Sequence, residues 1–224
     1  MGKFITIDGL DGSGKGTQSD LLCAWLRAQG KNVRELSFPC YGKKSAAAVE
    51  MYLGGELGSR PEDTNAYAAS SFFSIDRYLS FRTDWERDWR DPDTVIVSNR
   101  YTTANAVHQL SKLPREQWKD FLSWLWEFEF DRLGLPRPDV VLYLEMPPEI
   151  SMRLVEHRSQ ETGQKKDIHE LSREHLINSY EAALYASKTL GWTRVRCFEG
   201  TEPLPIGEIQ EKLRKILIPY LQNG

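Results

Sequence analysis

A short β-rich run near the start of the chain leads into a glycine-rich loop and then into a helical pattern. The run is Lys3 to Asp8, the loop reads GLDGSGKGT over residues 9–17, and the helical pattern from Lys15 closes at Gly30. The loop fits G-x-x-x-x-G-K, in which backbone N–H groups curl around phosphate oxygens while the lysine and the helix start add positive charge. A chance glycine-rich turn is the alternative, but the strand–loop–helix context favours a phosphate-binding loop.

The rest of the chain alternates strand-like and helix-like segments. Further strands are expected at residues 32–38, 94–98, 139–145 and 193–198. Helices are expected at residues 45–53, 61–90, 114–133, 147–157, 172–190 and 206–221, and residues 158–170 have the composition of a mobile loop. Strands separated by helices predict an α/β fold, with a parallel sheet flanked by helices on both faces. Polar residues at the strand ends, such as Asp8 and Asn99, should then line one rim of the sheet.

Composition excludes several classes of protein. The 224 residues suit one domain, here 1–224, and the net charge of −3 implies no general affinity for nucleic acid or for acidic membranes. Cys23, Cys40 and Cys197 are widely spaced and read as free thiols in a reducing compartment. We find no signal peptide and no apolar run long enough to span a bilayer. We therefore expect a cytoplasmic, soluble protein with no membrane or nucleic-acid partner.

Several motifs in order carry a family resemblance that covers nearly the whole chain. They are FITIDGLDGSGKGTQ at the start, Phe38-Pro39, SFFSIDR at 71–77, VIVSNRY at 95–101 and DVVLYLEMPPE at 139–149. The chain resembles the thymidylate kinases, within the nucleoside monophosphate kinases. The resemblance implies a P-loop kinase with a five-stranded parallel sheet and a lid at about 153–170. It also implies a homodimer and transfer of the ATP γ-phosphoryl group to dTMP, with Mg²⁺, to give dTDP and ADP.

The resemblance also implies roles on the side of the phosphate donor. Lys15 would hold the ATP phosphates, and Asp11 would lie near the acceptor 3′-hydroxyl and the Mg²⁺ ion. Arg100 would bridge the two phosphate groups, since its rigid fork of donors suits that task. The remaining loop residues assigned to ATP are Gly9, Gly12, Ser13, Gly14, Gly16 and Thr17. The alternative for Arg100 is a structural ion pair at a strand end.

On the acceptor side, the resemblance implies that Phe73 stacks on the base and that Arg77 hydrogen-bonds a base carbonyl. The two residues are four apart and share a helical face. Core packing is the alternative for Phe73, and an exposed surface arginine is the alternative for Arg77. Asn105 matches a position that contacts the thymine edge. The other residues assigned to the acceptor are Phe38, Pro39, Tyr41, His108 and Gln109.

The sequence departs from the family pattern at positions related to metal and phosphate. Gly16 replaces the usual Ser or Thr, and Asn99 replaces an aspartate, so its amide oxygen would ligate a hard cation only weakly. Asp11 or Asp8 would then hold the metal, or catalysis would be reduced. Gly12 stands where some members have a catalytic arginine. Basic residues of the lid would supply the missing charge, with Arg158 acting in catalysis and Arg153 binding ATP. Lys165 and Lys166 are further candidates. The alternative is that these residues form an ordinary solvated charged face.

Other positions leave alternatives open. An arginine that the family often has after the Phe-Pro motif, near the acceptor phosphate, is absent here. Lys43 and Lys44 either supply the missing positive charge or are ordinary solvated lysines. The aromatic run WKDFLSWLWEFEF at 118–130 is either a buried helix or a partner surface, with core packing favoured. His157, His169 and His175 lack a metal-ligand spacing and read as surface or lid residues.

Two other functions stay open for the whole chain: a kinase for another deoxynucleoside monophosphate or a deoxynucleoside, and a low-turnover nucleotide-binding module.

Overall fold

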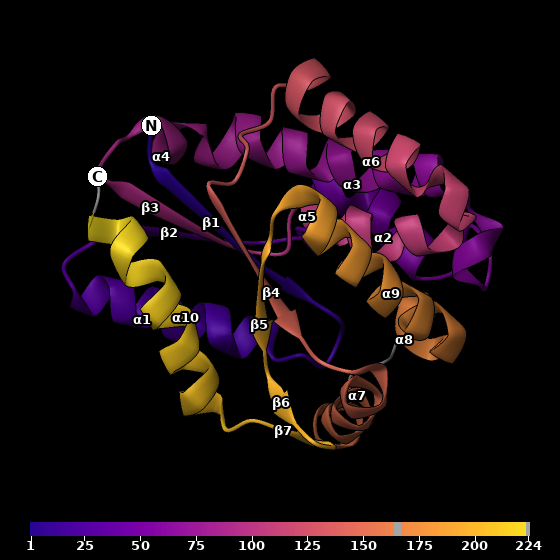
Figure 1. Ribbon diagram of the computed structural model, residues 1–224. Coiled ribbons are helices and arrows are strands. Elements are labelled where there is room, and N and C mark those ends of the chain that lie inside the picture. Colours follow the sequence, from indigo (N-terminus) through magenta and orange to yellow (C-terminus); the bar gives the residue numbers. More distant parts are fainter. Residues whose placement is uncertain (164–166, 223–224) are drawn as a thin grey trace.

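Five parallel strands form the centre of the molecule. The computed structural model describes residues 1–163 and 167–222. The sheet order is β2-β3-β1-β4-β5, and every neighbouring pair is parallel (Figure 1). The strands are β1 (Lys3–Gly9), β2 (Asn32–Ser37), β3 (Thr94–Asn99), β4 (Val140–Glu145) and β5 (Thr193–Arg196). The prediction of a five-stranded parallel sheet flanked by helices is confirmed.

Helices α1 (Lys15–Ala28) and α10 (Ile206–Gln222) cover one face of the sheet (Figure 1). Side chains alternate along a strand, so Ile5 and Ile7 of β1 point to this face. They form a buried core with leucines of both helices: Leu22, Leu26, Leu213 and Leu217. Phe4, Thr6 and Asp8 alternate with them, which places Asp8 on the other face at the carboxyl end of β1.

Helices α3 (Ala66–Ser80), α5 (Thr102–His108), α6 (Trp118–Trp126) and α9 (Arg173–Leu190) lie on the opposite side (Figure 1). Trp118, Phe121 and Leu125 of the aromatic run pack in a buried cluster with small residues of α9. This arrangement bears out core packing for that run. The shorter helical segments on this side are Lys44–Ala46, α2 (Ala47–Leu53) and Leu110–Lys112.

Two segments expected as single long helices are interrupted. Residues 61–90 comprise a 3-10 turn (Pro61–Asp63), α3, a π-helical turn (Phe81–Trp85) and α4 (Glu86–Arg90). Residues 114–133 comprise a 3-10 turn (Arg115–Gln117), α6 and a π-helical turn (Glu127–Arg132). A π turn holds one residue more than an α turn and so rotates the side chains that follow. In the second π turn, Glu129 and Phe130 are both buried.

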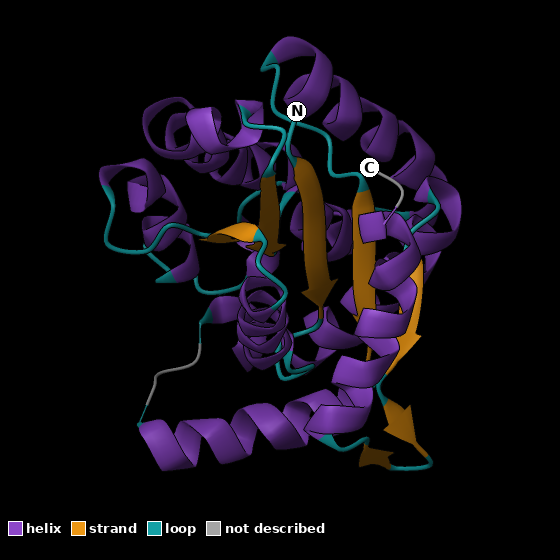
Figure 2. Cartoon of the chain, turned by 90° about the vertical axis from the view of Figure 1, so that its left-hand side faces the viewer, coloured by secondary structure: helices purple, strands orange, loops and turns teal. Residues whose placement is uncertain are grey.

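The segment after β4 crosses the carboxyl ends of the strands. Helix α7 (Pro148–Thr162) lies below the strand arrowheads in Figure 2, near the hairpin of β6 (Phe198–Glu199) and β7 (Glu202–Pro203). The expectation of a loop over 158–170 is wrong for its two ends. Helix α7 extends to Thr162, and α8 (Ile168–Leu171) follows, because Asp167 caps it by accepting from the amides of His169 and Glu170 at 2.9 Å. No helix in the described ranges is both long and apolar enough to cross a membrane.

Candidate active site

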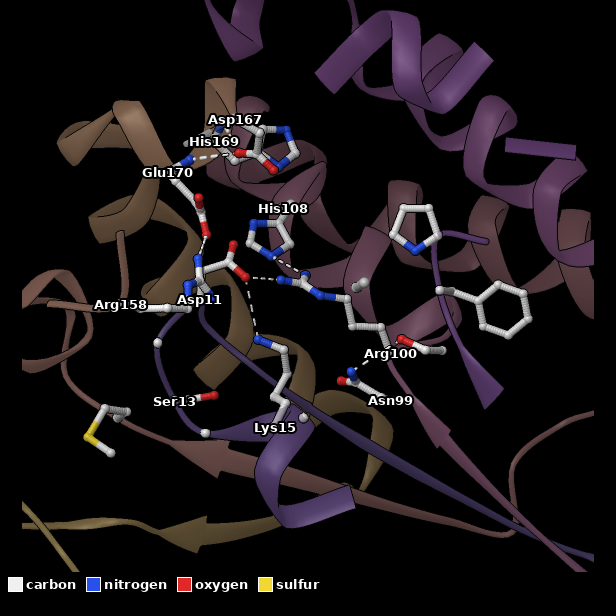
Figure 3. A pocket seen from close by; sticks show the side chains of 18 of the residues that line it. Asp11, Ser13, Lys15, Asn99, Arg100, His108, Arg158, Asp167, His169 and Glu170 are labelled. Atoms are coloured by element: carbon white, nitrogen blue, oxygen red, sulfur yellow. Dashed lines mark hydrogen bonds and ion pairs between the residues drawn. The ribbon is translucent and has the colours of Figure 1, made fainter. Parts of the chain in front are cut away.

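A cavity of about 1450 Å³ opens at the carboxyl rim of the sheet. It gathers most of the predicted site residues from the loop after β1 and the start of α1, from the segment after β2, from the end of β3, and from α3, α5 and α7 (Figure 3). These lining residues are Asp11, Gly12, Ser13, Gly14, Lys15, Gly16, Thr17, Phe38, Pro39, Tyr41, Phe73, Arg77, Asn99, Arg100, Asn105, His108, Gln109 and Arg158. Gly9 lies outside the lining, as the last residue of β1 opposite Leu144 of β4.

The glycine-rich loop has the backbone that a phosphate site needs. Gly12 has a φ of 84°, and a Cβ there would lie 2.4 Å from the Ser151 carbonyl oxygen of α7, so no larger residue fits. Gly14 precedes α1 and provides no side-chain cap for it. The amides of the first turn of α1 are therefore left for an anionic ligand. The hydroxyl of Ser13 is also buried without a hydrogen-bond partner in the described part of the chain.

Two cations share the carboxylate of Asp11 at the mouth of this loop. Lys15 Nζ lies 3.5 Å from Asp11 Oδ1 and donates to the Leu10 carbonyl oxygen at 2.8 Å, while Arg100 pairs with the same Asp11 oxygen (Figure 3). Burial alone would raise the pKa of Asp11, but Arg100 and Lys15 outweigh it and hold that pKa well below its usual range. Burial and the nearby Arg100 lower the pKa of Lys15 to about 8. Phosphate groups between these cations would favour the charged lysine.

Arg100 takes an unusual backbone conformation at the end of β3. Its φ is 66°, the only positive value among the described residues other than glycine, and its amide donates to the Ile7 carbonyl oxygen at 2.9 Å. Its side chain reaches Asp11 and donates from Nη1 to His108 Nε2 at 3.0 Å (Figure 3). A positive φ is uncommon for residues other than glycine and often marks a functional site. The local fold thus directs the Arg100 guanidinium toward the loop.

Asn99 brings an unsatisfied oxygen to the same cavity. Its Nδ2 donates to Ser37 Oγ at 3.3 Å, and its buried Oδ1 has no partner within the described residues. Asp8 lies behind the loop, where burial raises its carboxyl pKa despite Arg100 and where it accepts from the Thr103 hydroxyl. Oxygen atoms of Asp11 and Asn99 therefore face the cavity. Those of Asp8 instead accept hydrogen bonds from buried groups of the protein.

Three of the four histidines form a buried stack beside Arg100. The ring centroids are 5.1 Å apart for His108 and His169, 4.5 Å for His169 and His175, and 5.7 Å for His108 and His175. The interpretation of His169 and His175 as surface or lid residues is therefore wrong, because α5, α8 and α9 bring these distant residues together. His157 is exposed, as expected.

The stack is neutral near physiological pH. Burial lowers the pKa of His108 and His169 well below the usual value, and burial with the nearby Lys112 lowers that of His175 to about 4. The Tyr52 hydroxyl lies 2.8 Å from His169 Nε2 and holds that ring in place. His108 and His169 thus give the cavity an uncharged polar wall.

Among the residues predicted for the acceptor, Arg77 is buried, so the alternative of an exposed arginine is wrong. It forms a two-point ion pair with Glu129, with Nε–Oε2 at 2.8 Å and Nη2–Oε1 at 2.5 Å. Phe73 lines the cavity and packs edge-on against Tyr52, with ring centroids 6.1 Å apart. Phe73 therefore both lines the cavity and packs against a buried core residue.

The basic residues predicted to act from a lid separate into two groups. Arg158 lines the cavity and pairs with Glu170. Arg153 pairs instead with Glu202 of the β6–β7 hairpin, outside the cavity lining, and its assignment to ATP stays a prediction. Of the two readings left open for Lys43, the structure fits a solvated lysine, since its exposed Nζ lies 3.1 Å from Asp84 Oδ2. The candidates Lys165 and Lys166 lie outside the described residues.

Reasoning from sequence missed four acidic or aromatic residues of this region: Glu129, Asp167, Glu170 and Tyr52. Asp167 followed by Glu170 three residues later is a helix-start signature that would have located α8. A carboxylate between Phe128 and Phe130 was a weaker sign that Glu129 is buried with a cationic partner. Tyr52 carries no local signal, since its role depends on contact with α8.

Comparisons with known proteins agree with this site. Residues 7–189 match the family model described as thymidylate kinase. The chain belongs to the thymidylate kinase family. A thymidylate kinase from Mycobacterium tuberculosis is 32% identical over 192 residues, covering 84% of this chain and 87% of that protein. A probable thymidylate kinase from Methanothermobacter thermautotrophicus is 29% identical over 217 residues, covering 97% and 95%.

The fold agrees with this membership. The solved thymidylate kinase of Candida albicans superposes with a TM-score of 0.68 at 20% identity, covering 98% of this chain and 92% of that one. The thymidylate kinase family consists of P-loop enzymes that phosphorylate nucleoside monophosphates, so this chain is an enzyme of that kind. The loop from Gly9 to Thr17 and the residues around Arg100 lie within the matched range.

Proposed function

We propose that this chain transfers the γ-phosphoryl group of ATP to dTMP, giving dTDP and ADP. The convergence of Lys15 and Arg100 on Asp11, between the glycine-rich loop and the cavity wall that holds Arg77, carries this proposal. Phosphoryl transfer needs in-line positioning and neutralisation of charge more than covalent chemistry. A pair of largely buried cations between a donor site and an acceptor site supplies both.

On the donor side, the ATP phosphates occupy the loop and the open amides of α1, where Lys15 contacts them. Arg100 then leaves Asp11 and binds oxygens of both phosphate groups, so that charge developing during transfer is neutralised. Asp11, released from the cations, is placed to hold the acceptor 3′-hydroxyl. Arg158 reaches the cavity from α7 and, of Arg153 and Arg158 in the described part of this segment, is the one that would contact phosphate.

On the acceptor side, the base lies against Phe73 while Arg77 and Asn105 contact its polar edge. His108 and Gln109 would lie toward the sugar, and Phe38, Pro39 and Tyr41 also line the cavity. These side chains leave room for a nucleotide in a cavity of about 1450 Å³. The arrangement favours a monophosphate acceptor, because its phosphate would reach Arg100.

We also propose Mg²⁺ as the metal. The Asp11 carboxylate and the unpartnered Oδ1 of Asn99 face the cavity, and oxygen donors of this kind suit that ion. Bound with ATP, Mg²⁺ would neutralise phosphate charge.

Free buried thiols at Cys23 and Cys197 support a cytoplasmic location. The homodimer implied by the family stays a proposal that sedimentation would test.

The acceptor is tested by measuring ADP release from MgATP with dTMP, dUMP, dCMP, dGMP, AMP and thymidine supplied separately. We expect the highest kcat/KM with dTMP, because the cavity combines a base-stacking ring with a phosphate-binding arginine. Preference for another compound would relocate the function to a different nucleotide or nucleoside kinase. Tight ATP binding with no ADP formed would identify a binding module instead.

Replacing Asn99 by aspartate should raise kcat with dTMP by about tenfold, equivalent to about 1.4 kcal/mol in the barrier. The added negative charge would strengthen the contact with a hard cation at an oxygen that has no partner within the described residues. Steady-state ADP release at several Mg²⁺ concentrations would measure this effect and a lower Mg²⁺ requirement. Asn32→Asp, at the exposed start of β2, is the control. Equal rates would mean that Asp11 holds the metal without help.

A further inference from the structure

A buried carboxylate lies beneath the acceptor end of the cavity. Glu129 belongs to the second π turn and is fully buried, yet side chains of α3 and α5 surround it with donors. Its Oε1 accepts from Ser74 Oγ at 2.9 Å, Arg77 Nη2 at 2.5 Å and Asn105 Nδ2 at 3.3 Å. Its Oε2 accepts from Arg77 Nε at 2.8 Å and Thr102 Oγ1 at 2.6 Å. One negative charge therefore organises two cavity-lining residues, Arg77 and Asn105.

The contacts of Asn105 fix which end of its amide faces the cavity. The same terminal atom lies 3.3 Å from the Ser70 carbonyl oxygen and 3.3 Å from Glu129 Oε1. Both neighbours only accept hydrogen bonds, so that atom must be the NH₂ group. The amide oxygen is thereby left for the cavity that Asn105 lines, and within the described residues no donor bonds to it. Asn105 thus presents an acceptor to the base.

Arg77 presents the complementary group. Its guanidinium uses Nε and one Nη2 hydrogen on Glu129 and one Nη1 hydrogen on the Tyr101 carbonyl oxygen, at 3.3 Å. An arginine has five N–H donors, so two remain, and Arg77 lines the cavity. The two-point pair with Glu129 prevents the guanidinium from turning. The donor of Arg77 and the acceptor of Asn105 are therefore oriented by the same Glu129 carboxylate, and both side chains line the cavity.

We propose that Glu129 is a positioning residue that sets this donor–acceptor pair and so selects the base. Thymine and uracil present a ring carbonyl next to a ring N–H, which matches a donor beside an acceptor. Cytosine presents an amino group next to an unprotonated ring nitrogen, so donor would face donor and acceptor would face acceptor. Buried polar groups left unpaired in this way reject an analogue by about 10⁴-fold. This inference deepens the proposed function, because it concerns the base in the same acceptor site.

The inference is tested by equilibrium binding of dTMP and dCMP to the whole chain without ATP, using Glu129→Gln. The glutamine keeps the shape but brings an NH₂ group toward Arg77 or Asn105, so the Asn105 amide loses its fixed orientation. We expect the preference for dTMP over dCMP to fall at least about 100-fold from the wild-type ratio. Glu127→Gln is the matched control, since this exposed glutamate of the same π turn pairs with Arg132. It should leave the ratio unchanged.

A second variant covers the case in which Glu129→Gln fails to fold. Arg77→Met with Glu129→Leu removes both charges together, which keeps a buried site stable better than leaving one charge alone. Its preference between dTMP and dCMP should fall below about tenfold. A folded variant that keeps the wild-type ratio would overturn the inference, even if affinity for both nucleotides fell. A wild-type chain that prefers dTMP in binding but forms no ADP would contradict the proposed function and leave this inference standing.

Discussion

Replacing Arg100 by alanine is expected to lower kcat with dTMP and MgATP by about 10³-fold, the lower end of what an arginine contributes to phosphoryl transfer. The guanidinium is 18% exposed and lies between the glycine-rich loop and the histidine stack, where its charge is only partly screened. Its contacts should strengthen as charge moves between the phosphates, so kcat should fall more than KM rises. Steady-state ADP release at saturating ATP would measure both quantities.

Two further variants show which property of Arg100 matters. Arg100→Lys keeps the charge but not the fork of donors, so we expect it to recover about one tenth of the lost activity. Arg132→Ala, on the exposed surface, is the control and should match the wild type. A fall in kcat/KM that comes entirely from KM would contradict a bridging role and would assign Arg100 to ground-state binding of one nucleotide.

The free energy of unfolding is expected to fall by about 3 kcal/mol between pH 7 and pH 4 through His175 alone. Burial and Lys112 lower the folded-state pKa of His175 to about 4, whereas an unfolded histidine titrates near 6.5. Between these values the unfolded chain binds more protons than the folded chain, so stability decreases as pH falls. Above about pH 7 both states are neutral and the effect disappears.

Denaturant unfolding of the wild type and of His175→Phe at several pH values would isolate this contribution. Phenylalanine keeps a flat ring in the stack but does not titrate, so the variant curve should lose less stability toward pH 4. Burial raises the pKa of Asp167 to about 6, which acts in the opposite direction, but this effect is common to both chains and cancels in their difference. His157→Gln at the exposed site should follow the wild type. Parallel curves for wild type and His175→Phe would contradict the buried stack.

The strands and the phosphate loop could be predicted because their signals are local. Each central strand is a short, largely apolar run between breaks, and the sequence bounds differ from the structure by one or two residues. The loop needs only the backbone freedom of Gly12 and Gly14 and the helix that starts at Lys15. Because parallel strands end at one rim, the sequence also indicated that Asn99 and Arg100 would approach the loop.

The rest of the site depends on contacts between distant parts of the chain. Arg77 and Glu129 are 52 positions apart, and nothing in either helical pattern shows that they pair. The stacked rings of His108, His169 and His175 come from three helices, each with ordinary polar spacing. The π turns were also missed, since a periodicity of 3.6 residues extends through one extra residue without an evident break.

The π turn at Glu127–Arg132 ties base preference to the length of the chain as well as to its chemistry. A π turn is an α-helix that has gained one residue, and each residue of an α-helix turns by about 100°. Deleting a single residue ahead of Glu129 would restore an unbroken α-helix and swing this carboxylate away from Arg77. An insertion or deletion here could therefore retune a nucleotide kinase during evolution while every residue that touches the nucleotide stays the same.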